Sequence, residues 1–193
     1  MRLGTNNQDA VAGCSRDGVL AVCVADGCSE GAFSEVGARL IARFVADRAC
    51  SGLGPAAVVD ALVSWLQGLS LGQDFVQEQL LSTFLCAVAR DGVVTVFGIG
   101  DGVVSIDGAR TELDAGPDNA PAYAAYRLLG MDAPLVVHFC GVASRVAIAT
   151  DGARALDLTS SFGWSNPHAL QRRLNVTGGL HDDCSVALLE VRP

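Results

Sequence analysis

The chain has 193 residues, of which half are hydrophobic, and a formal net charge of −8. This acidic balance argues against nucleic acid or an anionic membrane as a partner, because phosphate neutralisation needs clustered Lys and Arg. No apolar run approaches the ~20 residues of a membrane-spanning helix, and residues 1–10 lack the apolar segment of a secretory signal. We expect a cytoplasmic, monomeric protein that folds as a single domain over residues 1–193.

The seven cysteines are typical of small core residues in a reducing compartment. Their number is odd, no C-x-x-C pair occurs, and the chain has only three His. A Cys/His zinc site of familiar spacing is therefore not supported.

The N-terminal part of the chain predicts a hairpin followed by two helices. Apolar runs at residues 10–14 and 19–25 flank a turn at residues 15–18. Residues 33–49 carry apolar side chains at helical spacing, and a second helix opens at Pro55. Three apolar residues of the first helix are expected to face inwards: Phe33, Val36 and Leu40.

The rest of the chain predicts mainly strands. Residues 83–90 and 93–99 flank an Asp-Gly turn and form a second hairpin. Residues 109–132 are irregular or partly helical. A short helix is expected at residues 167–174, and further strands are expected at residues 103–106, 134–140, 145–150 and 184–191.

The order of these elements predicts the fold class. Strands and helices come in blocks without strict alternation, which favours an α+β fold with mostly antiparallel sheets. Many strands are apolar at both alternating sets of positions, so each sheet needs cover on both faces. Two sheets packed together with helices outside satisfy this need. We therefore predict a four-layer α-β-β-α sandwich.

Six Asp-Gly dipeptides occur in the sequence, and they fall into different classes. Those at Asp17, Asp91 and Asp107 lie between short strands and are typical of turns. Asp26 and Asp151 instead end apolar runs and precede small polar residues. The dipeptide at Asp101 is intermediate, because residues 98–102 fit either a tight turn or a close backbone approach.

Four strands deliver an aspartate at one end, at Asp9, Asp26, Asp151 and the pair Asp182-Asp183. If these ends meet, the carboxylates repel one another unless cations compensate them. Hard oxygen ligands favour Mg²⁺ or Mn²⁺, and two such ions support phosphoryl chemistry. Spacing alone leaves this metal site and ordinary turn chemistry as alternative interpretations.

Five motifs in series make the interpretation more specific, because together they resemble the metal-dependent protein phosphatases of type 2C. The resemblance covers essentially the whole chain and is greatest for the compact bacterial branch. The motifs are Asn7-Gln8-Asp9-Ala10, Val24-Ala25-Asp26-Gly27, Ser82-Thr83-Phe84 with Gly100-Asp101-Gly102, Ala149-Thr150-Asp151-Gly152, and His181-Asp182-Asp183-Cys184-Ser185-Val186.

The resemblance implies a phosphoserine/phosphothreonine protein phosphatase with two Mn²⁺ or Mg²⁺ ions at one end of the sandwich. A water bridging the ions attacks phosphorus in such enzymes. The substrate would be a phosphorylated protein, either a partner kinase or its target. By position, Asp9, Asp26, Asp151 and Asp182 would be the catalytic ligands, with Asp26 bridging. The Gly27 carbonyl would contribute, and Asp101 would bind a third, weaker ion together with Asp151.

The sequence departs from the family pattern at three positions. The departures at Gln8 and Gly4 favour an alternative, a degenerate phosphatase-fold module that binds a phosphoprotein or regulates a kinase. Gln8 replaces a frequent Glu, and Gly4 replaces an Arg that holds substrate phosphate. Cys28 stands where eukaryotic members have an acidic His. Three arginines are candidates to replace the missing one: Arg2, Arg16 and Arg154. A nucleotide-binding reading of residues 97–102 is rejected because no helix follows.

Overall fold

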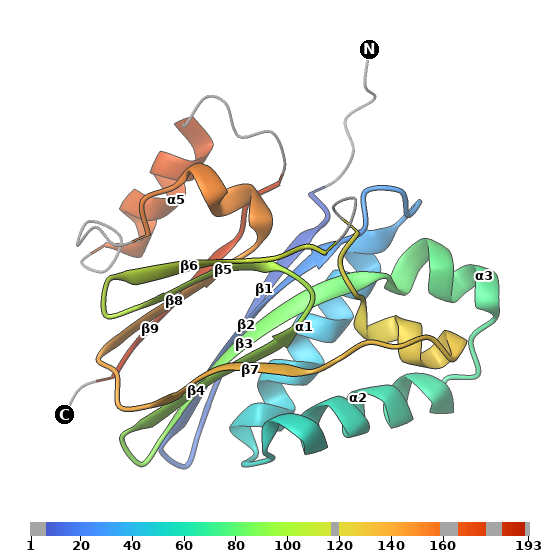
Figure 1. The fold of residues 1–193 in the computed structure, drawn as a ribbon, viewed down its shortest axis with the longest axis horizontal. Coiled ribbons are helices and arrows are strands. Elements are labelled where there is room, and N and C mark those ends of the chain that lie inside the picture. Colours follow the sequence, from blue (N-terminus) through green and yellow to red (C-terminus); the bar gives the residue numbers. More distant parts are fainter. Residues whose placement is uncertain (1–6, 117–119, 159–165, 177–182, 192–193) are drawn as a thin grey trace.

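The computed structural model describes residues 7–116, 120–158, 166–176 and 183–191 (Figure 1). Within these ranges the strands form two antiparallel sheets, as predicted. The five-stranded sheet has the order β1 (Asp9–Arg16), β2 (Val19–Gly27), β3 (Ser82–Arg90), β4 (Val93–Ile99) and β7 (Val136–Gly141). The four-stranded sheet has the order β6 (Ala109–Leu113), β5 (Gly102–Ile106), β8 (Arg145–Ala149) and β9 (Val186–Glu190).

Helices cover the outer face of each sheet, which confirms the predicted four layers (Figure 1). The five-stranded sheet is covered by α1 (Ser34–Cys50), α2 (Pro55–Gly68), α3 (Gln73–Phe75), the π-helix η1 (Val76–Leu80) and the 3₁₀-helix η3 (Ala124–Leu129). The four-stranded sheet is covered by the 3₁₀-helix η4 (Asp151–Ala155) and by α5 (Pro167–Val176). In the described part of the chain, no helix has the length and apolar character to cross a membrane.

The hairpin turns behave as the Asp-Gly dipeptides predict. Asp17, Asp91 and Asp107 have φ values of 48°, 50° and 47°, and the glycine after each also has a positive φ. Two consecutive residues with positive φ match the right-handed twist of antiparallel strands. These three aspartates therefore serve the backbone, and they are excluded as ligands of a shared site.

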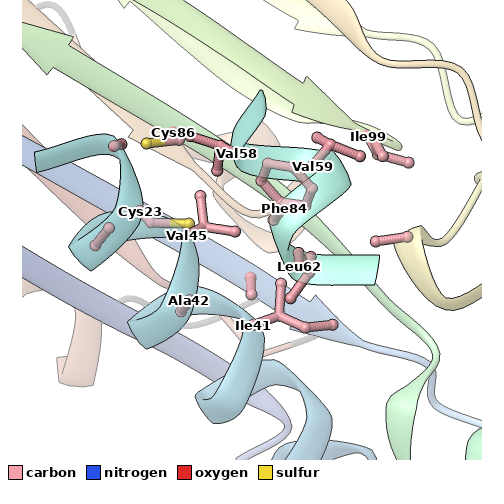
Figure 2. Packing of buried hydrophobic residues seen from close by; sticks show 14 of the residues in the cluster. Cys23, Ile41, Ala42, Val45, Val58, Val59, Leu62, Phe84, Cys86 and Ile99 are labelled. Carbon is pink, nitrogen blue, oxygen red and sulfur yellow. The ribbon is translucent and has the colours of Figure 1, made fainter. Parts of the chain in front are cut away.

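Three hydrophobic cores separate the layers. The first lies between the helices and the five-stranded sheet, where Ile41 and Val45 of α1 and Leu62 of α2 pack against Phe84 of β3 (Figure 2). The second lies between the two sheets, and the third lies between the four-stranded sheet and η4 with α5. Among the cysteines, Cys23, Cys50 and Cys86 are buried, whereas Cys140 is exposed.

The rotation of α1 about its axis differs from the sequence prediction. Phe33, Val36 and Leu40 are 54%, 36% and 36% exposed, so the expectation that they face inwards is wrong. The buried face instead carries small residues and two branched ones: Ala38, Ile41, Ala42, Val45, Ala46 and Ala49. Alanines allow the helix axis to approach the sheet closely, and this packing outweighs the burial of three larger side chains.

Candidate metal centre

Strand register places the first two predicted ligands side by side. Asp9 begins β1 and lies directly opposite Asp26 near the end of β2. The two-residue turn at Asp17-Gly18 determines this pairing, because a hairpin's register follows from its turn. Asp26 in turn lies opposite Thr83 of β3. One end of the five-stranded sheet thus carries two neighbouring carboxylates.

The carboxylate of Asp9 is buried but only partly hydrogen-bonded. The side chain is 7% exposed, and its Oδ2 accepts a hydrogen bond of 2.7 Å from the hydroxyl of Thr150. Its Oδ1 is buried and has no hydrogen-bond partner. Burial raises the pKa of Asp9 to about 6, the Thr150 hydrogen bond opposes this rise, and the charge of Asp183 adds to it.

Thr150 and Gln8 join the ends of the two sheets at this point. The Thr150 backbone N–H donates to the carbonyl of Ser185 at 3.0 Å, and the Ser185 N–H donates to the Thr150 hydroxyl at 3.0 Å. The Gln8 N–H donates to Oδ2 of Asp183 at 2.7 Å. These bonds connect β1 with the segments that follow β8 and precede β9. The sequence prediction did not single out Thr150, whose only signal was its place beside Asp151.

Asp101 and Asp151 form a second acidic pair, contributed by the four-stranded sheet. Asp101 sits between Gly100 and Gly102, whose φ values of 97° and 134° favour glycine and give the chain its tight bend. The Asp101 side chain is 4% exposed, and its Oδ2 lies 3.0 Å from Nη2 of Arg154. Oδ2 of Asp151 lies 3.6 Å from Nη1 of the same guanidinium.

The two carboxylates of this pair influence each other. Burial raises the pKa of Asp101, the charge of Asp151 raises it further, and the charge of Arg154 lowers it. Oδ1 of Asp151 is buried without a hydrogen-bond partner, as is Oδ1 of Asp9. Each of the two sheets therefore presents one carboxylate oxygen that the described protein atoms leave unsatisfied.

A cavity of about 90 Å³ brings the acidic residues together. Its walls include Asp26, Asp101 and Asp151 from three different strand ends, with Cys28 and Tyr123 beside them. Asp9 adjoins it through its pairing with Asp26. The predicted ligand Asp182 lies outside the described residues. A larger cavity of about 410 Å³ lies between α2, η1 and η3, but its walls are Leu, Val, Gln and Ser without an ionisable side chain.

The donor set fits hard divalent cations. Buried carboxylate oxygens without hydrogen bonds are costly unless a cation binds them, and Mg²⁺ and Mn²⁺ prefer such oxygens. The negative field extends to Cys184, whose pKa is raised to about 12 by burial and then by the charges of Asp9 and Asp151. Within the described ranges, no three His, Cys, Asp or Glu side chains already form a closed metal-binding group.

Gln8 and Gly27 both pack against the start of α1. The Gln8 side chain donates to the Ser34 hydroxyl at 2.7 Å and so holds the loop that precedes α1. A Cβ on Gly27 would lie 2.8 Å from Oγ of Ser34 and 2.9 Å from the Gln8 carbonyl. Close packing therefore explains the glycine, and its carbonyl stays a predicted ligand.

Cys28 faces a residue that the sequence prediction missed. Burial raises the pKa of Tyr123, and a hydrogen bond with Cys28 raises it further. Tyr123 directly precedes η3, in the segment expected to be irregular or partly helical. An aromatic residue in such a segment gives no sequence signal of a site. The phenol therefore stays protonated beside the acidic cavity.

Two of the three candidate arginines can be placed. Arg16 ends β1 at the far end of the strand from Asp9 and pairs with Asp47 at 3.3 Å, so it does not belong to the site. Arg154 belongs to it through its contacts with Asp101 and Asp151. Arg2 lies outside the described residues.

Three solved structures have the same fold as this chain. RsbX in complex with magnesium has a TM-score of 0.65 at 14% identity, with 97% of this chain and 88% of that chain covered. The catalytic domain of the serine/threonine protein phosphatase PstP with two manganese ions has a TM-score of 0.62 at 16% identity, with 99% and 94% covered. The serine/threonine phosphatase Stp1 from Staphylococcus aureus has a TM-score of 0.62 at 11% identity, with 100% and 92% covered.

Identities this low establish the shared fold only. A search of curated protein sequences found no match. The family model described as protein phosphatase 2C matches residues 1–176, a range that contains Asp9, Asp26, Asp101 and Asp151. By this match, and in agreement with the resemblance found in the sequence motifs, the chain belongs to the protein phosphatase 2C family.

Proposed function

We propose that the protein is a Mg²⁺- or Mn²⁺-dependent phosphatase that hydrolyses phosphoserine and phosphothreonine in proteins. One observation carries the proposal: each sheet presents a buried carboxylate oxygen without a hydrogen bond, on Asp9 and on Asp151, and Thr150 beside Asp151 donates to Asp9. Membership of the protein phosphatase 2C family supports the same conclusion.

The residues that would hold two ions are Asp9, Asp26, Asp151 and Asp182, with the Gly27 carbonyl as a further donor. When bound, two such ions polarise a water for in-line attack on phosphorus and neutralise charge on the phosphoryl oxygens. Solved structures of the same fold support this composition, because PstP is described with two manganese ions and RsbX with magnesium.

The chain's own contribution is to position and orient these carboxylates. The Thr150 hydroxyl donates to Oδ2 of Asp9, and Oδ1 has no hydrogen bond and is available to a cation. Ser82 donates to the Asp26 carbonyl at 2.8 Å and holds the end of β2 in place. Such fixed oxygens cost little reorganisation when a cation binds. The substrate would be a phosphorylated protein, either a partner kinase or its target.

The alternative is a degenerate module of the same fold that binds a phosphoprotein or regulates a kinase without hydrolysis. It is favoured by one observation: among the described arginines near the acidic cavity, Arg154 contacts two carboxylates. Carboxylates therefore already occupy its guanidinium. The family's phosphate-binding arginine belongs at a different position in the chain, which is Gly4 here. The retained aspartates oppose this alternative.

A turnover assay distinguishes the two functions. Purified protein supplied with Mn²⁺ is expected to hydrolyse a chromogenic aryl phosphate and a phosphothreonine peptide, and EDTA is expected to abolish both reactions. Metal-replete, folded protein without turnover on either substrate would overturn the enzymatic proposal. Binding of the phosphopeptide without hydrolysis would establish the alternative.

A further inference from the structure

The guanidinium of Arg154 occupies the space between two carboxylates of the acidic cavity. Nη2 lies 3.0 Å from Oδ2 of Asp101, and Nη1 lies 3.6 Å from Oδ2 of Asp151. The Asp101 side chain is 4% exposed, so this contact is shielded from solvent on the carboxylate side. The positive charge thus sits where an ion shared by these two aspartates would have to bind.

The backbone holds Arg154 in this place. The residue lies three positions after Asp151 in η4, so both side chains project from the same short helix. The Arg154 carbonyl accepts a hydrogen bond from Nη2 of Arg110, which itself pairs with Glu112 on β6. Strand β6 therefore restrains the turn that carries the guanidinium.

The chemistry of the pair favours arginine over an exchangeable ion. A guanidinium keeps its charge at every physiological pH, and its planar fork contacts two carboxylates at once. Asp101 and Asp151 repel each other, and the charge of Arg154 offsets that repulsion. A divalent cation at the same point would have to displace the guanidinium from both oxygens. The third ion implied by the family resemblance therefore does not fit these residues.

We propose that Arg154 is a built-in cation that replaces the third metal ion, so that the chain holds two divalent ions and excludes another at Asp101. This inference rests on the proposed function, since it presupposes that the other aspartates bind two ions. Arg154 is a positioning residue in this role: it neutralises Asp101 and orients Asp151, and it need not touch substrate.

The test is the number of Mn²⁺ ions bound by metal-stripped protein, measured from the electron paramagnetic resonance signal of free Mn²⁺ during titration. The wild type is expected to bind two ions. Arg154→Gln is expected to bind one more, and the double variant Arg154→Gln/Asp101→Asn is expected to lose that additional ion. Arg145→Gln is the matched control, because Arg145 pairs with Glu190 at the far end of β8.

Three results would overturn the inference. The wild type could bind three Mn²⁺ ions, folded Arg154→Gln could bind the same number of ions as the wild type, or Arg145→Gln could also bind an additional ion. Circular dichroism checks folding of each variant. If Arg154→Gln does not fold, Asp101→Asn alone decides, since a fall in ion number there would show that Asp101 already binds metal. A wild type that binds no Mn²⁺ refutes the proposed function together with this inference. Two bound ions without turnover refute the enzymatic activity and leave the inference intact.

Discussion

Among single residues, Asp9 and Asp151 stand out because each buries one carboxylate oxygen without a hydrogen bond. Leaving such an oxygen unsatisfied costs about 1–3 kcal/mol in a folded protein. A bound ion or water is one explanation for such an oxygen in a native structure. The two residues come from different sheets, so a cation bound by both would also bind the sheets to each other.

Replacing Asp151 by Asn is expected to lower turnover by at least ~100-fold. The change removes a negative charge that would hold a divalent ion next to the reacting phosphoryl group. Steady-state kinetics with Mn²⁺ measures the loss. Asp91→Asn is the matched control, since Asp91 is exposed in a hairpin turn and Asn-Gly serves such a turn equally well. Wild-type rates in Asp151→Asn would refute its assignment as a ligand.

The raised pKa of Asp9 predicts how pH affects the metal-free protein. Asp9 has a pKa of about 6 in the folded protein, against an ordinary value of 3.8. Between these values the folded state holds a proton that the unfolded state releases. The contribution of Asp9 to the free energy of unfolding therefore falls as pH rises from about 4 to 6, and it is constant above that range. The expected loss is of the order of 3 kcal/mol.

Urea denaturation of metal-free protein at several pH values measures this effect. The difference in unfolding free energy between wild type and Asp9→Asn isolates it, because other titrating groups contribute to both proteins. A difference that does not change between pH 4 and pH 7 would contradict the raised pKa of Asp9.

Cys28 lines the acidic cavity, and its thiol forms a hydrogen bond with Tyr123. Cys28→Ala is therefore expected to keep turnover within about threefold of the wild type, the change expected for a lost neutral hydrogen bond. The same kinetic assay measures it, with Cys140→Ala on the exposed edge of β7 as the control. A loss as large as that of Asp151→Asn would assign Cys28 a direct part in the reaction.

Among the elements, α1 and η1 approach each other most closely at Gly37. A Cβ at this position would lie 2.2 Å from the carbonyl oxygen of Gln79 and 2.7 Å from Cα of Leu80. Both are backbone atoms, which cannot rotate away. The loop between β2 and α1 is tied to the same region, because the N–H of Cys28 donates to the carbonyl of Leu81 at 2.9 Å. The packing of α1 on η1 thus also positions the cavity.

Gly37→Ala is expected to destabilise the fold by about 1–3 kcal/mol, the usual cost of overpacking. Gly68→Ala at the end of α2 is the matched control, because nothing lies within 4 Å of its Cβ. That change is expected to stabilise by up to about 1 kcal/mol, since alanine loses less entropy in a helix. Urea denaturation compares the two, and equal stability of both variants would refute the close approach.

For the whole molecule, the acidic residues lie where the two sheets join, so an ion bound there would also affect stability. Asp9 and Thr150 connect one sheet to the other, and unsatisfied oxygens lie on both sides of that connection. An ion bound by carboxylates of both sheets favours the folded state over the unfolded state. The free energy of binding is then added to the free energy of unfolding.

Mn²⁺ at about one hundred times its dissociation constant is expected to stabilise the protein by about 2.7 kcal/mol. Thermal denaturation with and without Mn²⁺ measures the gain, and Asp91→Asn is expected to respond like the wild type. Asp151→Asn is expected to lose most of the response. An equal gain in Asp151→Asn would mean that the ion binds elsewhere.

The sequence determined most of the elements and the candidate ligands, because both depend on local chemistry. The Asp-Gly turns required two residues with positive φ, and alternating apolar runs defined the paired strands. The ends of those strands carried Asp9, Asp26 and Asp151, and the observed cavity includes or adjoins all three. The prediction for Asp182 falls outside the described residues.

Only the tertiary structure decided how these pieces face one another. The inward face of α1 depends on how closely alanines approach the sheet, which helical spacing does not encode. Gln8 contacts Ser34 across 26 positions of the chain, and Arg154 contacts Asp101 across 53. Such long-range pairs arise from packing between layers. For that reason the residue types predicted a cation site, whereas only the fold showed that the guanidinium of Arg154 contacts Asp101 and Asp151.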